Sequence, residues 1–463
     1  MNRIPNELLA EILSKSLVNG GDYADVYIEQ ERPLFIQLED DRIEKLTSGT
    51  DCGVGVRVIF EDKTYYAYSN DFSEKSLFDI AGTVSRAVKG GQGNGRTYDL
   101  RKLRPTVDYK IKYCPEDIST KEKISFLERS NRAARGVSSK IKQVTIVYRD
   151  SVKSVCVASS DGTIAEDERI YTLALIQVIA AEGDILQTAY EAVGGLAGFE
   201  LFDEEPFEEI VLNASHKAVA LLSARKAPGG RMPVIISAAA GGTMIHEAVG
   251  HGLEADLVQQ GLSVYKGKVG EQIASPVVTI IDDATLRNKR GSFRFDDEGV
   301  NAQRTVLVDK GVLKGYMYDR LTAMKEGVSS TGNGRRQSYK DRPIPRMTNT
   351  FIASGEDDPE RIIKSIDRGL FVRKMGGGQV NTVTGEFVFE VSEGYLIEKG
   401  NVGEPVRGAT LIGNGPEVLK SIDMVGNDIG FAIGTCGKDA QGVPVSDAMP
   451  TVRIPEMVVG GEV

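Results

Sequence analysis

The sequence predicts an α+β protein in which an N-terminal region of antiparallel sheets with covering helices precedes a strand-rich C-terminal domain. Short stretches of alternating apolar and polar residues recur along the chain and are typical of half-buried strands. A few longer stretches have the period of an amphipathic helix and separate groups of these strands. The 51 glycines among 463 residues indicate many turns and strand ends.

The first 105 residues combine strands with two flanking helices. The opening helix begins at Pro5, which suits a first turn, and ends before Gly20-Gly21. The strands are interpreted as an antiparallel meander under the second helix. The predicted elements are a helix at 5–17, strands at 25–30, 34–39, 53–60 and 64–69, and a helix at 73–89.

Residues 106–225 show a similar alternation of helices and strands. The pair Asp161-Gly162 predicts a hairpin turn between two strands. The last helix of this stretch contains His216, which lies among Ala and Leu and is interpreted as a surface or packed histidine rather than a ligand. The predicted elements are a helix at 119–136, strands at 152–159 and 163–167, and a helix at 204–225.

The segment 226–231, which contains Pro and Gly, is the predicted domain boundary. A chain of this length exceeds what one hydrophobic core supports. We therefore expect an N-terminal α+β domain at 1–225, with possible sub-regions 1–105 and 106–225, and a C-terminal domain at 226–463. The C-terminal predictions are strands at 233–236, 277–281, 305–308, 312–317, 386–391 and 394–398, a helix from 243 to about 258, and short helices at 358–368 and 416–423.

Composition narrows the classes of partner and location. The net charge of −10, without a basic cluster, disfavours nucleic-acid binding. No apolar stretch approaches the roughly 18 residues of a membrane span, and the N-terminus does not resemble a signal peptide, so we expect a cytoplasmic protein. The four cysteines are far apart and form no CxxC pair, which disfavours a disulfide scaffold.

The most informative motif is His246-Glu247-x-x-x-His251, which contains two of the three histidines of the chain. Histidine is the commonest nitrogen ligand of zinc, and a neighbouring carboxylate is the usual base for water activation. Five residues turn a regular helix through about 500°, so the two rings would point roughly 140° apart. A π-type widening, or a kink at Gly250 and Gly252, would bring them together. Otherwise the two histidines are unrelated helix residues.

A catalytic zinc needs a third protein ligand and an open position. Glu254 and Asp256 are the local candidates. Cys436 is the distant one, within a glycine-containing segment interpreted as a loop that permits close approach. A free cysteine is also commonly a small buried hydrophobe, so the residues alone leave the third ligand open.

Arg335 and Arg336, which follow Gly332-Asn333-Gly334, are weaker candidates for substrate binding. They would hold a carboxylate or line a cleft that takes an extended peptide as an added strand. The alternative interpretation is a pair of solvated arginines in a glycine-rich turn.

The chain resembles the TldD/PmbA family of metalloproteases over nearly its whole length. The resemblance rests on Gly53-Val54-Gly55-Val56-Arg57, the His246-Glu247-x-x-x-His251 core, Gly332-Asn333-Gly334-Arg335-Arg336-Gln337 and Gly434-Thr435-Cys436-Gly437-Lys438. It implies that His246, His251 and Cys436 bind zinc and that Glu247 activates the water. Because every element of the motif is present, the chain is similar to the metal-bearing TldD branch.

The resemblance further implies a cytoplasmic peptidase that acts on unfolded or short peptides, together with a PmbA-like second subunit or as a homodimer. The strand-rich C-terminal domain, which carries the HExxxH helix, would then be catalytic, with Glu247 as general base. Two alternatives stay open: a non-catalytic partner or scaffold with structural zinc or none, and a metal hydrolase of a non-peptide amide.

Overall fold

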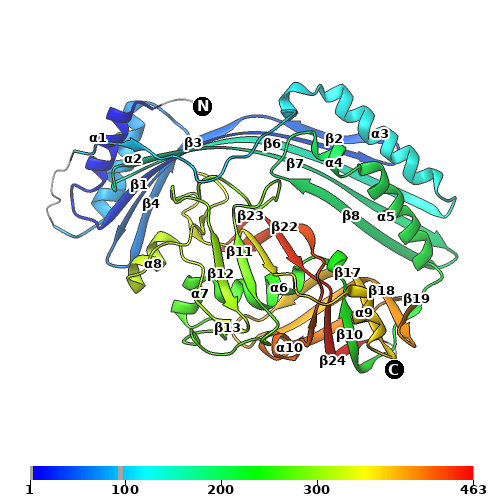
Figure 1. Cartoon of the computed structure of the whole chain (residues 1–463). Coiled ribbons are helices and arrows are strands. Elements are labelled where there is room, and N and C mark those ends of the chain that lie inside the picture. Colours follow the sequence, from blue (N-terminus) through cyan, green and yellow to red (C-terminus); the bar gives the residue numbers. More distant parts are fainter. Residues whose placement is uncertain (1–3, 92–96, 462–463) are drawn as a thin grey trace.

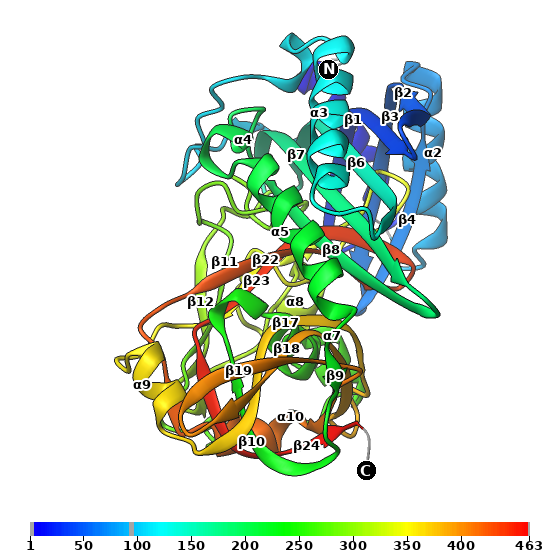
Figure 2. The same cartoon turned by 90° about the vertical axis from the view of Figure 1, so that its right-hand side faces the viewer.

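The computed structural model describes residues 4–91 and 97–461. An eight-stranded sheet and its helices form the N-terminal part, which lies above the C-terminal part in two perpendicular views (Figures 1 and 2). The sheet has the order β4-β3-β1-β6-β7-β5, with β2 paired to β1 and β8 to β7. Its strands are β1 (Tyr23–Glu39), β2 (Arg42–Ser48), β3 (Asp51–Phe60), β4 (Lys63–Ser69), β5 (Arg101–Lys102), β6 (Ile141–Ser159), β7 (Thr163–Glu182) and β8 (Ile185–Gly195).

Helices cover one face of this sheet, and the C-terminal part packs against the other. Side chains alternate between the faces along each strand. Ile28 and Ile36 of β1 are buried beneath the helices, whereas Tyr27 packs with Tyr339 of the C-terminal part. The N-terminal helices are α1 (Asn6–Ser16), α2 (Glu74–Ala87), a 3-10 turn η1 (Pro115–Asp117), α3 (Thr120–Gly136), α4 (Leu201–Glu204) and α5 (Phe207–Leu221).

Several N-terminal predictions were wrong in detail; for example, the strands expected at 152–159 and 163–167 are the longer β6 and β7. The strands expected at 25–30 and 34–39 are one strand, β1, despite Pro33. Along one edge of β1, β3 pairs as far as Glu31 and β2 pairs from Leu34, so neither strand pairs with Pro33. A proline, which has no N–H to donate, is tolerated at such a gap in the ladder. Because β1 also pairs with the distant β6, the sheet is not a simple meander.

The helix expected at 204–225 is shorter than predicted: α4 ends at Glu204, and α5 begins at Phe207, directly after its N-cap Pro206, and ends at Leu221. The turn at Asp161-Gly162 is confirmed, since Ser159 pairs with Thr163 across it.

The C-terminal part contains two large sheets that enclose the main core. The eight-stranded sheet has the order β17-β10-β24-β20-β18-β19-β9, with β21 paired to β24. Its strands are β9 (Arg225–Lys226), β10 (Gly230–Ile236), β17 (Arg368–Val380), β18 (Glu386–Glu398), β19 (Asn401–Arg407), β20 (Thr410–Asn414), β21 (Met424–Val425) and β24 (Val452–Gly460). The segment 226–231, predicted as the domain boundary, therefore includes residues of β9 and β10. The division of the chain into domains at 1–225 and 226–463 stays a prediction.

The six-stranded sheet has the order β13-β12-β11-β16-β23-β22, so β22 is an edge strand among the described residues. Its strands are β11 (Ile280–Asp283), β12 (Arg304–Asp309), β13 (Val312–Leu313), β16 (Asn349–Ile352), β22 (Gly430–Lys438) and β23 (Gln441–Met449). A two-stranded sheet joins β14 (Gly334–Arg335) to β15 (Ile344–Pro345), and the remaining helices outside the site are η2 (Ala238–Ala240), α8 (Arg320–Glu326), α9 (Pro359–Lys364) and α10 (Gly415–Ser421).

Two corrections concern the C-terminal part directly. The segment around Cys436, expected as a loop, is strand β22, paired with β23 over its whole length. Of its glycines, Gly430 faces closely approaching backbone: a Cβ there would meet the carbonyl oxygen of Ala238 at 2.1 Å. The strands expected at 386–391 and 394–398 form the single strand β18. Within the described residues, every helix is too short or too polar to cross a bilayer.

Candidate metal centre

The predicted motif helix is irregular at the positions of the two histidines. Helix α6 (Thr243–Ile245) continues as the π-helix η3 (His246–Gly250), followed by the 3-10 turn η4 (His251–Leu253). The backbone N–H of His251 donates to the carbonyl of His246, five residues earlier, which is the π-type widening predicted from the spacing. The two rings therefore lie on one side, with centroids 5.1 Å apart.

The helix does not continue to residue 258. Glu254 is extended, with φ −75° and ψ 122°, and α7 (Ala255–Gln260) begins after it. Close packing explains the two glycines of the motif: a Cβ on Gly250 would lie 2.0 Å from the sulfur of Met347, and one on Gly252 would lie 2.7 Å from the ring of Tyr265. Both neighbours are buried in the core between the C-terminal sheets.

Strand β22 brings Cys436 to the two histidines. One possible ligand atom from each of His246, His251 and Cys436 lies within 4.8 Å of the other two. The sulfur of Cys436 is 3.6 Å from Nε2 of His251. Ligands about 2.0–2.3 Å from a shared zinc can be separated by such a distance. All three side chains are nearly buried, so few water molecules compete for them.

The electrostatics of the group favour the thiolate form of Cys436. Burial alone would raise the pKa of the thiol. The hydrogen bonds and charges of His246 and His251 outweigh burial and lower this pKa from 9.0 to about 5. Thiolate is the form that binds metals, and two imidazoles with one thiolate are a donor set suited to zinc. The residues present therefore fit this ion.

Glu254 contacts the ring nitrogen of His251 that faces away from Cys436. Its Oε2 is 2.9 Å from Nδ1 of His251, and Nζ of Lys438 donates to the same oxygen at 3.1 Å. Lys438 also donates to Asp256 at 2.7 Å. Burial would raise the pKa of Glu254, but the charges of Lys438 and His251 prevail and lower it to about 2. The two local alternatives for the third ligand thus support His251 and Lys438, and neither belongs to the converging group.

Asp447 is the carboxylate that lies near Nδ1 of His246. Its Oδ2 is 3.7 Å from Nδ1 of His246, too long for a hydrogen bond, and this nitrogen is buried without a partner among the described residues. Burial raises the pKa of Asp447 to about 6 despite the opposing charge of His246. Glu247 is half-buried on η3, and its charge contributes to the same rise. The candidate base is therefore near enough to Asp447 for their charges to interact.

Arg335 and Arg336 are both buried, so the interpretation as solvated arginines in a turn was wrong. Arg335 donates to the carbonyls of Met347 and Pro444 at 2.5 and 2.7 Å. The backbone N–H and Nη2 of Arg336 donate to Asp297 at 2.8 and 2.9 Å. Both arginines line a cavity between the N-terminal eight-stranded sheet and the β22–β23 hairpin. Whether they bind substrate stays a prediction.

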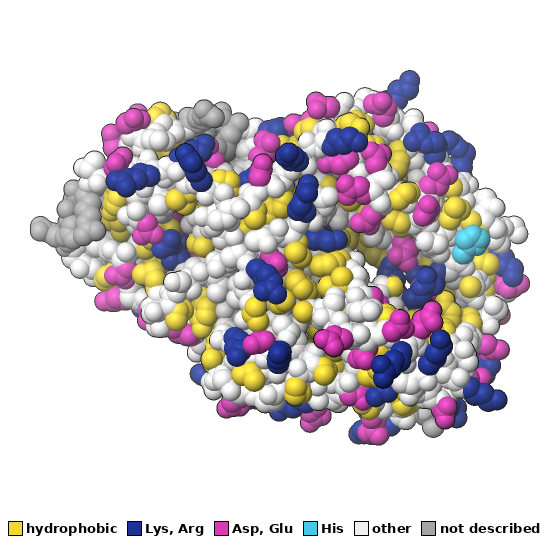
Figure 3. Space-filling view, viewed as in Figure 1, with side chains coloured by type: hydrophobic (Ala, Val, Ile, Leu, Met, Phe, Trp, Pro, Cys, Tyr) yellow, Lys and Arg dark blue, Asp and Glu magenta, His cyan; other side chains and the backbone are white. Residues whose placement is uncertain are grey.

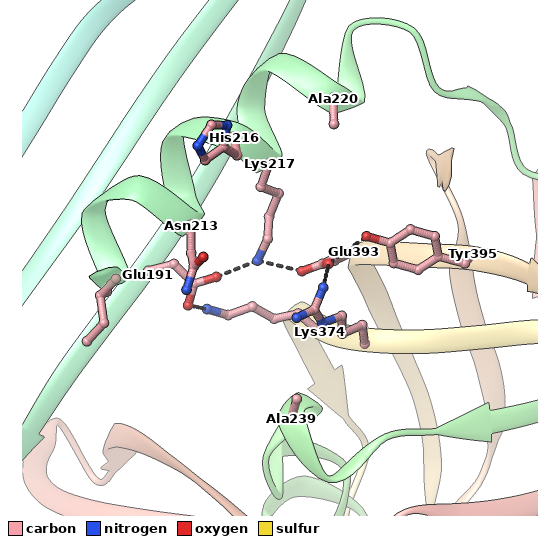
Figure 4. A pocket seen from close by; sticks show the side chains of 11 residues that line it. Glu191, Asn213, His216, Lys217, Ala220, Ala239, Lys374, Glu393 and Tyr395 are labelled. Atoms are coloured by element: carbon pink, nitrogen blue, oxygen red, sulfur yellow. Dashed lines mark hydrogen bonds and ion pairs between the residues drawn. The ribbon is translucent and has the colours of Figure 1, made fainter. Parts of the chain in front are cut away.

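His216 is exposed on α5 and does not join the metal-ligand group, as predicted. It lines a separate cavity of about 370 Å³ between α5 and strands β17 and β18 (Figure 4). There Lys217 contacts Glu191 and, at 2.6 Å, Glu393, while Lys374 contacts Glu191. A hollow is visible between the upper and lower parts of the molecule at the right of Figure 3.

Sequence reasoning missed the roles of Lys438 and Asp447. The only available signal for Lys438 was its position two residues after Cys436, which places both side chains on one face if the segment is a strand. Because the segment was interpreted as a loop, this signal was not used. Asp447 follows from the pairing with Ala432 across the hairpin, which the sequence does not reveal.

The fold and the site define an α+β protein with a His/His/Cys candidate metal centre between a π-helix and an edge hairpin. Family models for the PmbA/TldA metallopeptidase match domain 1 at residues 24–90, the central domain at 113–222 and the C-terminal domain at 229–461. The metalloprotease TldD homologue of Haemophilus influenzae is 38% identical, and the alignment covers 100% of this chain and 99% of that protein.

The chain belongs to the TldD/PmbA metallopeptidase family. Two solved structures confirm the fold. A Thermotoga maritima protein described as a modulator of a DNA gyrase has a TM-score of 0.80 and 24% identity, covering 95% of this chain and 96% of its own. TldE from Thermococcus kodakarensis has a TM-score of 0.75 and 20% identity, covering 95% and 97%.

Proposed function

We propose that this chain is a zinc-dependent peptidase in which His246, His251 and Cys436 hold the ion and Glu247 is the general base. The convergence of two imidazoles and a thiolate, directly beside a glutamate, carries this proposal. A closed structural zinc site has four protein ligands, whereas three ligands leave a position for water. Membership of a family named for metallopeptidases supports the same reading.

Each residue of the site has a distinct chemical task. Zinc, when bound, supplies the Lewis acidity that makes a water molecule acidic near neutral pH. Glu247 accepts the proton of the attacking water on its carboxylate and delivers it to the leaving amine nitrogen. Glu254 fixes the ring of His251 through Nδ1, which leaves Nε2 directed towards Cys436.

The substrate would be an unfolded or short peptide bound in extended form. Strand β22 carries Cys436 and is the edge of its sheet among the described strands. An extended peptide can add to such an edge through backbone hydrogen bonds, which give affinity with little dependence on side chains. This mode would bring a peptide backbone beside the ligand group.

We propose in addition that the chain functions with a PmbA-like second subunit or, alternatively, with a second copy of itself. The likeness of its fold to TldE supports the idea that two such chains can pair. Light scattering on the purified chain, alone and mixed with a PmbA-like protein, tests this. A monomer under both conditions would contradict it.

The decisive test of the peptidase is Glu247→Ala. This variant should retain zinc but lose cleavage of an unfolded peptide library, and a chelator should abolish the wild-type activity. Full activity in Glu247→Ala would reject the assigned base. If the wild type binds zinc but cleaves no peptide, a scaffold function or hydrolysis of another amide is favoured instead.

A further inference from the structure

A cavity of about 490 Å³ lies between the long N-terminal sheet and the β22–β23 hairpin. Thr435 of β22 lines it, immediately before Cys436 in the chain. Because successive side chains of a strand point to opposite faces, Cys436 faces the two histidines while Thr435 faces this cavity. The cavity and the candidate metal centre therefore lie on the two sides of one edge strand.

The cavity is lined by more positive than negative groups. The basic residues are Arg149, Lys153, Arg169, Arg290, Arg335 and Arg336, and the acidic ones are Glu31, Asp150 and Asp297. Each acid already has a partner: Asp150 binds Lys123 at 2.5 Å, Asp297 binds Arg169 at 2.8 Å, and Glu31 accepts from Ser151 at 2.8 Å and lies 4.0 Å from Lys153. The acidic residues therefore leave several arginines uncompensated.

Three of the arginines lack a carboxylate at ion-pair distance within the described part of the chain. Arg335 donates only to the carbonyls of Met347 and Pro444. Arg290 donates to the carbonyl of Gly434 and, at 3.2 Å, to the hydroxyl of Thr435. The exposed Arg149 stacks 4.8 Å from the ring centroid of Phe35.

The charges of Arg149 and Arg290 repel each other. Burial lowers the pKa of Arg290, and the neighbouring charge of Arg149 lowers it further. Burial also lowers the pKa of Arg335; Asp297, whose charge opposes this, is paired with Arg169. An anion that entered the cavity would relieve this repulsion, because guanidinium groups bind carboxylates through paired hydrogen bonds.

We propose that Arg149, Arg290 and Arg335 form a carboxylate-binding subsite, so that the preferred substrates are peptides with an acidic side chain or a free C-terminus beside the scissile bond. This inference rests on the proposed peptidase function. A peptide added along β22 would direct alternate side chains to the Thr435 face and hence into the cavity. Arg336 is excluded, because its contacts go to Asp297 and Asp25.

The test measures peptide binding separately from cleavage. Three labelled peptides of equal length are compared by fluorescence anisotropy on the zinc-loaded Glu247→Gln protein: an amidated peptide with Gln, the same peptide with Glu, and the Gln peptide with a free carboxylate. At least one carboxylate peptide should bind roughly tenfold more tightly than the neutral one, as expected for a charge-assisted hydrogen bond. The peptide that gains affinity identifies the source of the carboxylate.

Arg149→Gln and Arg290→Gln should each remove most of this preference, while Arg132→Gln, an equal charge change at an exposed position on α3, should not. Equal affinity for all three peptides, or the same loss in Arg132→Gln, overturns the subsite. Cleavage of the neutral peptide by the wild type is followed in parallel. Its absence would reject the peptidase, while the binding preference would still decide the subsite.

Discussion

Replacing Glu254 by Gln should weaken zinc binding and destabilise the metal-free protein, although the residue is not among the converging ligands. The side chain is fully buried, 2.9 Å from Nδ1 of His251 and 3.1 Å from Nζ of Lys438. Its pKa is lowered from 4.5 to about 2. At 1.36 kcal/mol per unit this corresponds to about 3 kcal/mol of favourable interaction with the ionised form, similar to the roughly 3–5 kcal/mol lost when one partner of a buried ion pair is removed.

The sign of the pH dependence follows from the lowered pKa. The contribution of Glu254 to the free energy of unfolding is fully present above the unfolded pKa of 4.5 and is lost as the pH falls towards 2. Glu254→Gln should therefore lower the melting temperature of the metal-free protein at pH 7, and the difference from the wild type should shrink in acid. Zinc affinity should fall about 10–100-fold, the usual effect of losing a carboxylate that orients a ligating histidine.

Asp256→Asn is the matched control for this variant. Asp256 contacts Lys438 at 2.7 Å, but Glu254 is the carboxylate that contacts His251. The control should leave zinc affinity nearly unchanged, and because burial raises the pKa of Asp256, it should cost less stability than Glu254→Gln. Competition with a coloured chelator measures affinity, and thermal denaturation of both metal-free proteins measures stability. Zinc affinity equal to the wild type in Glu254→Gln would refute the assigned role of this carboxylate.

Three other variants test separate parts of the structure. Gly250→Ala would place a Cβ 2.0 Å from a buried sulfur, so thermal denaturation should show a loss of about 1–3 kcal/mol, whereas Gly437→Ala, with open space at its Cβ, should be neutral. Cys436→Ala should lower the zinc content measured by mass spectrometry, and Cys156→Ala, in the N-terminal sheet, should not; normal zinc in the first variant contradicts the ligand set. Lys217→Met removes ion pairs to two glutamates and should lower the melting temperature by a few degrees; no change would show that these pairs are energetically neutral.

The sequence predicted the local features well, because hydrophobic period and turn residues are local signals. The hairpin turn at Asp161-Gly162 and most helices follow from them. The π-helix was one of two solutions predicted for the five-residue histidine spacing. Non-local pairings were not predictable in this way: at Pro33 the partner of β1 along one edge changes from β3 to β2, and the sequence does not reveal this change. For the same reason, the sequence did not predict which residues contact Arg335 and Arg336.

The candidate site depends on the register of one hairpin. The side chains of Cys436 and Lys438 share a face of β22, where one approaches His251 and the other binds Glu254, while Thr435 faces the arginine-lined cavity. A slip of one residue would exchange the two faces and separate Cys436 from both histidines. Arg346 opposes such a slip, because its buried guanidinium donates to the carbonyls of Cys436 and Gln441, one on each strand. Cys436, which lies 185 residues from His251 in the chain, is therefore positioned by contacts that hold β22 and β23 in a single register.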